Sequence, residues 1–198
     1  MDRLILASAS PRRRELLENI GLKFDIIVSS ESEENIDNTL PPKLYTSELA
    51  VLKANCVAKK LIEEGRQKGI IIAADTVVYL DEKILGKPKN KEDAYLMLKS
   101  LSGRIHSVYT GICVLRLKDG FMVSEGVKTD VKFKDLDDEE ISKYILSNEP
   151  MDKAGSYGIQ GKGSLFVEKI DGDYFNVVGL PVSTLCEILK KEFDFDIL

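Results

Sequence analysis

The sequence predicts an α/β protein with a mixed, twisted sheet flanked by helices. In the first half of the chain, short apolar runs typical of buried strands alternate with segments whose apolar residues recur at helical spacing. In the second half, long strand-like runs are joined by short turns that contain glycine. The 198 residues are enough to bury a sizeable core, so we expect one domain over residues 1–198 with two lobes around a cleft.

The first half begins with a short apolar strand over 4–7. Ser10 and Pro11 are suited to the N-cap and the first position of a helix, and Gly21 is suited to its end. The expected elements that follow are, in chain order, a strand over 24–28, a polar loop over 31–42, a helix from Thr46 or Ser47 to near Gly65, a strand over 70–80, a short strand at 84–85, and a helix that begins at Asn90 or Lys91 and ends before Gly103.

The second half is richer in strand signals. Runs over 106–117 and 121–133 flank Lys118-Asp119-Gly120, a turn typical of hairpins. Further along, Asp137 and Glu140 resemble a capping box at the start of a helix. The remaining expected elements are a second hairpin, with strands over 164–170 and 174–178 around Asp171-Gly172-Asp173, and a last helix from Pro181.

Composition limits the classes of function. Asp and Glu number 33 against 28 Lys and Arg, a net charge of -5, which argues against a nucleic-acid polymer or a membrane surface as the partner. No apolar run approaches the roughly 20 residues of a spanning helix. The three cysteines are far apart, so no disulfide or zinc framework is visible, and we expect a reducing cytoplasm. The single histidine, His106, is expected to be structural.

The first candidate site is the turn around Ser8 and Ser10 and the arginines over 12–14. Positive side chains in the first turn oppose the helix dipole, so they cost stability unless an anion is present. A phosphate chain would supply that anion, held by backbone N–H groups, the serine hydroxyls and a bidentate arginine. A solvated basic turn is the alternative, and the glycines of a P-loop are missing.

Asp75 is the second candidate, because it interrupts the most apolar strand of the chain. A buried carboxylate must be paired, protonated or bound to a cation, and beside a phosphate site it is placed to hold a divalent metal or to take a proton from water. The alternative is a structural aspartate that caps a neighbouring loop. Glu31, Glu33 and Glu34 form an acidic rim suited to help hold a hard cation, although a solvated loop is the favoured interpretation for at least one of them.

The third candidate is the glycine-rich segment over 154–163. Its glycines allow close approach of a flat ligand, with Tyr157 placed to stack and Gln160 to hydrogen-bond the edge of a nucleobase. A plain hairpin loop explains the glycines but not the glutamine. Lys53 and Lys87 are each suited to neutralise phosphate, although most lysines of this kind are only solvated.

Several segments together carry a resemblance to one family. They are LILASASPRRRELL, AADTVV, GKP, LSGRIHSVYTG, EPMDKAGSYGIQGKG and VVGLP, in unbroken order over essentially the whole chain. In this set and order the chain is similar to the Maf family of nucleoside triphosphate pyrophosphatases. The resemblance implies an elongated, inosine triphosphatase-like α/β fold with two lobes around a cleft. It also implies hydrolysis of a nucleoside triphosphate to the monophosphate and diphosphate with a divalent cation, Mg²⁺, Mn²⁺ or Co²⁺.

The resemblance further implies a subgroup and a set of site residues. Arg12, Thr76 and Gln160 match the dTTP/UTP subgroup at the three positions that separate it from the 7-methyl-GTP subgroup. Asp75 stands at the position of the family's proton acceptor. Positions that contact phosphates are matched by Arg13, Lys53 and Lys87. The expected metal-side carboxylates are Asp75 and Glu34, with Glu33 as the alternative to Glu34.

The implied reaction is attack of water on the α-phosphorus, with Asp75 deprotonating or orienting the water. The implied role is removal of unwanted nucleotides from the pool, with a link to the arrest of cell division; whether a homodimer forms is left open. A non-catalytic nucleotide-binding regulator of septum formation is the competing class, but it needs no carboxylate poised for water. A DNA-binding regulator ranks last, because the chain has only one short arginine run.

Overall fold

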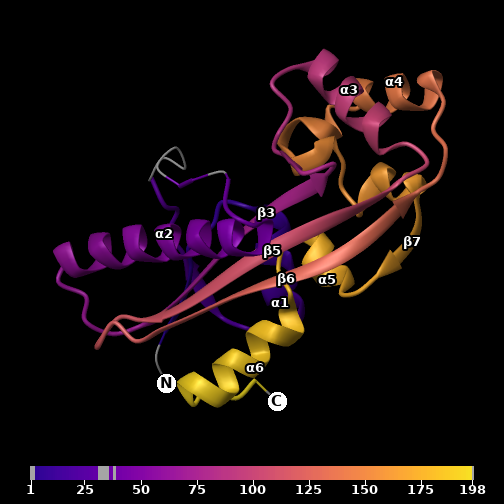
Figure 1. Cartoon of the computed structure of the whole chain (residues 1–198). Coiled ribbons are helices and arrows are strands. Elements are labelled where there is room, and N and C mark those ends of the chain that lie inside the picture. The colour runs from indigo at the N-terminus through magenta and orange to yellow at the C-terminus, as the bar shows by residue number, and fades with distance from the viewer. Residues whose placement is uncertain (1–2, 31–35, 38, 198) are drawn as a thin grey trace. The chain divides into compact units, whose positions relative to one another are not determined.

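A computed structural model of the protein describes residues 3–30, 36–37 and 39–197 (Figure 1). The sequence predicted most of its elements within a residue or two. In chain order they are β1 (Leu4–Leu6), α1 (Pro11–Asn19), β2 (Phe24–Ile26), α2 (Pro42–Glu63), β3 (Ile70–Leu80), β4 (Lys83–Leu85), α3 (Lys91–Leu101), β5 (Ile105–Arg116), β6 (Met122–Phe133), α4 (Asp138–Leu146), the 3-10 helices η2 (Glu149–Asp152), η3 (Ala154–Ser156) and η4 (Gly161–Phe166), β7 (Val167–Asp171), α5 (Tyr174–Val178) and α6 (Val182–Phe193).

The strands form a seven-stranded mixed sheet in the order β2-β1-β3-β5-β6-β7, with β4 paired to β3. In it, β1 lies parallel to both β2 and β3, whereas β4 is antiparallel to β3 and β7 is antiparallel to β6. The predicted mixed sheet flanked by helices is confirmed. The parallel strands come from the alternating first half of the chain, and the antiparallel ones come from its turn-rich parts.

The described chain divides into two compact units. Unit 1 comprises residues 1–75, 110–127 and 179–198, and unit 2 comprises residues 76–109 and 128–178. Each of the strands β3, β5 and β6 therefore contributes residues to both units.

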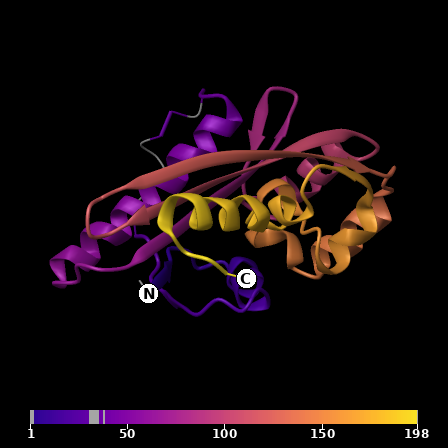
Figure 2. The ribbon, with the colours of Figure 1, turned by 90° about the horizontal axis from the view of Figure 1, so that it is seen from below.

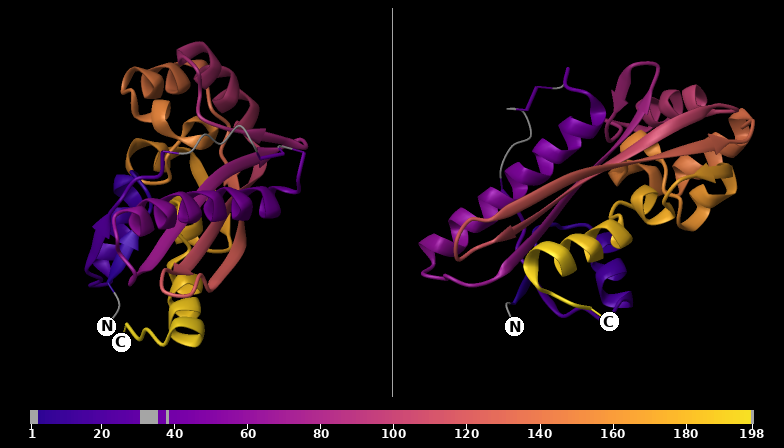
Figure 3. Two further views of the ribbon diagram at one scale, coloured as in Figure 1. Left: turned by 90° about the vertical axis from the view of Figure 1, so that its left-hand side faces the viewer. Right: turned by 60° about the horizontal axis from the view of Figure 1, so that its bottom comes forward.

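In unit 1, helices cover both faces of the strands. Alternate strand residues such as Ile5, Ile71 and Cys113 are buried against α2, where small residues including Ala50 and Ala54 allow close packing. Figures 2 and 3 show α6 on the opposite face of these strands from α2. Because both faces are covered, the strands of this unit are apolar at successive positions, as the sequence of β3 is.

Helix α2 begins earlier than the sequence predicted, at Pro42 rather than at Thr46 or Ser47. Proline suits the first turn of a helix because its missing N–H has no intrahelical partner there. The hydroxyls of Thr46 and Ser47 donate to the carbonyls of Pro42 and Lys43, at 3.0 Å each, so they bond within the helix instead of capping it.

In unit 2, α3 packs against α4. The Tyr95 hydroxyl and the Lys99 ammonium on α3 donate to the Asp138 carboxylate on α4 at 2.8 and 2.6 Å. The predicted capping box at the start of α4 is confirmed, with Asp137 and Glu140 each accepting from the backbone N–H of the other.

The predicted second hairpin is wrong. Tyr174–Val178 is the short helix α5, and only Val167–Asp171 is a strand, because residues 161–166 form η4. The Asp173 carboxylate accepts from the backbone N–H of Phe175 at 2.7 Å, which favours a helical turn over an extended chain. The Asn176 amide then donates to the Val108 carbonyl and the Thr129 hydroxyl at 3.1 and 3.0 Å, contacts that fix the helix in place.

Within the part of the chain that the structure describes, no helix combines the length and the apolar character needed to cross a membrane.

Candidate active site

Asp75 and Lys53 form an ion pair inside unit 1. The Lys53 ammonium on α2 donates to the Asp75 carboxylate on β3, and the two side chains are only 17% and 13% exposed. The prediction that this carboxylate must be partnered is confirmed. Its partner was not predicted, because the residues lie 22 positions apart and meet only when α2 packs on the sheet. A carboxylate fixed in this way can orient a water molecule and accept its proton.

The three arginines of α1 have different surroundings. Arg13 is buried, and its guanidinium donates to the Gly179 carbonyl at 2.8 Å and to the Ser8 hydroxyl at 3.1 Å. By contrast, Arg14 is exposed and pairs with Glu18 one turn along the helix at 2.7 Å. Arg13 therefore ties the start of α1 to the segment before α6, while its predicted contact with phosphate stays a prediction.

The beginning of α1 is the first predicted site, and its binding of an anion stays a prediction. Ser10 occupies the N-cap position, as predicted, but among the described residues its hydroxyl bonds none of the N–H groups of the first turn. Its own backbone N–H donates to the Ser8 hydroxyl at 3.2 Å. The first turn carries arginines and no acidic residue, so no carboxylate within that turn offsets the positive end of the helix dipole. Arg12, half-buried, lies in this same turn.

The turn that carries Lys87 is tied to the glycine-rich segment within unit 2. Lys87 is exposed, next to the buried Pro88, and the preceding Gly86 carbonyl accepts from the backbone N–H of Gly155 at 3.0 Å. Gly155 has a φ of 65°, and a Cβ there would lie 2.7 Å from the Val78 side chain, so only glycine fits. Two segments that the sequence singled out separately are thus adjacent in the fold.

Tyr157 and Gln160 differ in what they can offer a ligand. Tyr157 is 5% exposed, and its hydroxyl lies 2.8 Å from His106 Nε2 while its ring packs on Phe133. The expectation that Tyr157 stacks on a ligand is wrong, because this aromatic cluster buries it. Gln160 is half-exposed just before η4, and within the described chain its side chain does not cap that helix. The segment forms η3 and η4 rather than a hairpin loop.

His106 is structural, as predicted. Its side chain is 2% exposed, and burial lowers its pKa to about 4, against a smaller opposing effect of Asp130. Among the described residues, its Nδ1 has no hydrogen-bond partner. The imidazole is therefore neutral near pH 7 and contributes packing rather than acid–base chemistry.

The carboxylates available for a metal ion are few. The described residues contain no group of three His, Cys, Asp or Glu side chains that could hold one. Glu31, Glu33 and Glu34 lie outside the described residues. Asp75 is a hard oxygen donor, and Mg²⁺ is commonly held by one or two carboxylates together with phosphate oxygens, so the chemistry of this donor fits such an ion.

Comparison with known proteins matches the chain to one family. The model of the Maf-like protein family matches residues 3–192. The chain belongs to the Maf family. Similar relatives are named dTTP/UTP pyrophosphatase: those of Thermoanaerobacter sp. (strain X514), 53% identical, and of Alkaliphilus metalliredigens, 52% identical, with 99–100% of both chains covered. A dITP/XTP pyrophosphatase structure from Mycobacterium abscessus is 14% identical, with a TM-score of 0.40, over 66% of this chain and 72% of that one.

Sequence reasoning about this Maf protein missed three residues that contact predicted site residues or the segments that carry them. Tyr144, Glu149 and Gly179 were given no role in the site. Tyr144 and Glu149 contact the segment that carries Gln160, and Gly179 accepts from Arg13. The signal that could have found two of them is their place in the EPMDKAG and VVGLP segments that carry the Maf resemblance.

Proposed function

We propose that this Maf protein is a nucleoside triphosphate pyrophosphatase that hydrolyses dTTP and UTP, ordinary or modified, to the monophosphate and diphosphate. The observation that carries the proposal is the nearly buried Asp75, paired with Lys53, in a chain about half identical over its full length to proteins named dTTP/UTP pyrophosphatase. A charged carboxylate is costly to keep inside an apolar strand, so a role for it in chemistry accounts for its presence.

In the proposed reaction, water attacks the α-phosphorus and Asp75 takes a proton from that water. The bond between the α-phosphorus and the oxygen bridging to the β-phosphorus breaks, and that oxygen leaves with the diphosphate. The Lys53 ammonium contacts one carboxylate oxygen of Asp75, Oδ1, and thereby orients the carboxylate. This orientation matters because a general base must lie within hydrogen-bond reach of the proton that it removes.

The proposed reaction also requires that the negative charge of the triphosphate be neutralised. Ser10 and the start of α1 are suited to hold phosphate oxygens, because the positive end of a helix dipole attracts anions and the first turn of α1 carries no acidic residue. We assign Arg12, Arg13, Lys53 and Lys87 to the same task, where cationic groups stabilise the charge that develops on the leaving diphosphate. Arg13 also keeps the start of α1 in place through Gly179.

A divalent cation, Mg²⁺, Mn²⁺ or Co²⁺, completes the proposal, with Asp75 and Glu34 as the side chains that would hold it. When bound, such an ion supplies positive charge that stabilises the transition state of phosphoryl transfer. Recognition of the pyrimidine is assigned to Gln160, whose amide carries both a donor and an acceptor, with Arg12 and Thr76 as the other specificity positions. The cellular role that follows is control of the pyrimidine nucleotide pool in the cytoplasm.

The paired Asp75 favours this enzyme over a non-catalytic regulator of septum formation, which needs no such base. The test is a diphosphate-release screen of the full chain across dTTP, UTP, their modified forms and the purine triphosphates, with Mg²⁺, Mn²⁺ and Co²⁺ in turn. The proposal expects release from pyrimidine nucleotides first. Binding of these nucleotides without release under every metal would favour the regulator instead.

A further inference from the structure

We propose that Glu149, acting with Tyr144, is a positioning residue for base recognition, because it holds the loop of residues 158–163 in the conformation that presents Gln160. The inference rests on the proposed function in one respect, the role of Gln160 in reading the base. All of the contacts that carry it lie within unit 2.

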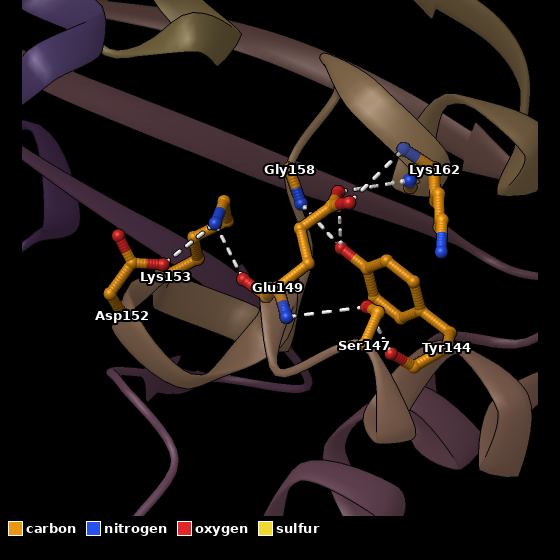
Figure 4. A network of polar contacts seen from close by, with 8 residues as sticks. Tyr144, Ser147, Glu149, Asp152, Lys153, Gly158 and Lys162 are labelled. Carbon is orange, nitrogen blue, oxygen red and sulfur yellow. Dashed lines mark hydrogen bonds and ion pairs between the residues drawn. The ribbon is translucent and has the colours of Figure 1, made fainter.

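The Glu149 carboxylate accepts three hydrogen bonds (Figure 4). Its Oε1 accepts from the Tyr144 hydroxyl at 3.0 Å and from the backbone N–H of Gly163 at 3.2 Å, and its Oε2 accepts from the backbone N–H of Lys162 at 3.2 Å. Both backbone donors belong to the first turn of η4, directly after Gln160. A carboxylate at this position is a strong acceptor for N–H groups that have no partner within the helix.

Tyr144 extends the same network to the other end of the loop. Its hydroxyl accepts from the buried backbone N–H of Gly158 at 3.2 Å while it donates to Glu149. Burial raises the pKa of Tyr144, so the phenol stays protonated and remains a donor. One phenol and one carboxylate therefore anchor the loop on both sides of Gln160, and the buried Ile159 holds it between them.

The glycines of the loop fit these anchors closely. Gly161 has a φ of 69°, and a Cβ there would lie 3.1 Å from both carboxylate oxygens of Glu149. At Gly163, a Cβ would lie 2.2 Å from the Gly158 carbonyl oxygen and 2.8 Å from the Tyr144 hydroxyl. A side chain at either position would displace the carboxylate or open the loop, so the glycines are explained by this packing.

Lys153 contacts both Glu149 and the loop that Glu149 holds. The Lys153 ammonium donates to the Glu149 carbonyl and, at 2.6 Å, to the Asp152 carboxylate. The alkyl part of Lys153 packs on Gly158, where a Cβ would lie 2.8 Å from it. Figure 4 shows Lys153 and the Tyr144 hydroxyl on different sides of Glu149. Such supporting contacts matter because an amide recognises a base edge only when its position is fixed to within about 0.5 Å.

The test compares Glu149→Gln with Glu139→Gln, a matched change at an exposed glutamate of α4 that pairs with Lys143 one turn away. With dTTP, UTP and GTP as substrates, Glu149→Gln is expected to lower kcat/KM for both pyrimidine nucleotides about tenfold, mainly through KM, and to leave GTP within about twofold. Equal losses for dTTP and GTP would overturn the proposal, since they would indicate general damage to the fold. A Glu149→Gln protein indistinguishable from Glu139→Gln would also overturn it.

A double-mutant cycle adds a second readout. Tyr144→Phe removes the hydroxyl that bridges Glu149 and Gly158, so it is expected to lower the preference for dTTP over GTP by a similar factor. Because the two side chains act as one unit, the double variant is expected to be little worse than either single variant. Fully additive losses would contradict the shared anchor.

The same variants are measured for binding of the non-hydrolysable α,β-imido analogues of UTP and GTP. This separates the inference from the proposed function. If the parent chain prefers the UTP analogue but releases no diphosphate, the proposed function fails and the anchor is judged on the loss of that preference. A parent chain without any preference between the two analogues would overturn the inference itself.

Discussion

The Lys53 ammonium on α2 donates a hydrogen bond to the Asp75 carboxylate on β3, and both side chains are largely buried. Removing either charge alone leaves the other in a poorly hydrated place, so the pair stabilises the fold only as a pair. The contact also orients the carboxylate that we propose as the general base. The hydrogen bond from Lys53 Nζ to Asp75 Oδ1 therefore serves both the stability of the fold and the proposed reaction.

Asp75→Asn is expected to lower kcat for diphosphate release by about 10³-fold, because an amide does not accept the proton of water and general-base catalysis contributes about 10²–10⁴-fold. A steady-state diphosphate assay measures the loss. Asp194→Asn is the matched control, since Asp194 is exposed and has a φ of 52°, a conformation that asparagine also adopts readily. Near-normal turnover of Asp75→Asn would remove Asp75 from the mechanism.

Lys53→Met is expected to lower the free energy of unfolding by about 3 kcal/mol, because it leaves the Asp75 carboxylate without its cationic partner. Urea denaturation measures the change, with Lys59→Met at an exposed position of α2 as the control. The double variant Lys53→Met, Asp75→Asn should recover part of the loss, since no charge then stays buried. If the double variant is as unstable as the sum of the single ones, the pairing contributes little.

Arg13 and Arg14 offer a comparison within one helical turn. Arg13→Ala is expected to lower the free energy of unfolding by about 2–4 kcal/mol, because the Gly179 carbonyl and the Ser8 hydroxyl lose a buried charged donor. Arg14→Ala should change it by less than about 0.5 kcal/mol, as expected for an exposed pair one turn apart. Chemical denaturation of both variants checks the difference, and equal effects would show that Arg13 does not tie α1 to its neighbour.

Local signals made much of the fold predictable from sequence. Asn90 caps α3 and accepts from the Asp93 N–H at 2.9 Å, as a residue of its type at that place predicts. The α5 helix was missed because β-branched and aromatic residues at 174–178 favour a strand, and Thr129 and Val108, which hold Asn176, are distant in the sequence. The start of α2 was missed because Thr46 and Ser47 imitate an N-cap while bonding within the helix.

The candidate site could be predicted only as a set of residue types. Asp75 was found because a carboxylate in an apolar strand demands a partner. Which partner it has follows from tertiary packing, as does the link from Arg13 to Gly179 across 166 positions. Tyr157 was misjudged because a tyrosine beside glycines can either stack on a ligand or pack in the core. Its buried contact with His106, which places it in the core, is not visible in the sequence.

Gln160→Glu is expected to lower kcat/KM for dTTP and UTP about tenfold relative to purine triphosphates, because a carboxylate loses the donor that the amide offers to a base edge. Competition between dTTP and GTP in one assay measures the ranking directly. Gln67→Glu makes the same chemical change at an exposed position of unit 1 and serves as the control. An unchanged ranking would remove Gln160 from base recognition.

His106 predicts a specific pH dependence of stability. Burial lowers its pKa to about 4 in the folded protein, whereas the unfolded chain binds the proton near pH 6.5. Below pH 6.5 the unfolded state therefore binds more protons at this residue, and stability falls as the pH drops from 6.5 towards 4, by about 2 kcal/mol between pH 7 and pH 5. His106→Phe should lack this slope in a urea-denaturation series, because phenylalanine carries no titrating group. Parallel slopes for the two proteins would show that His106 is protonated as readily in the folded state as in the unfolded one.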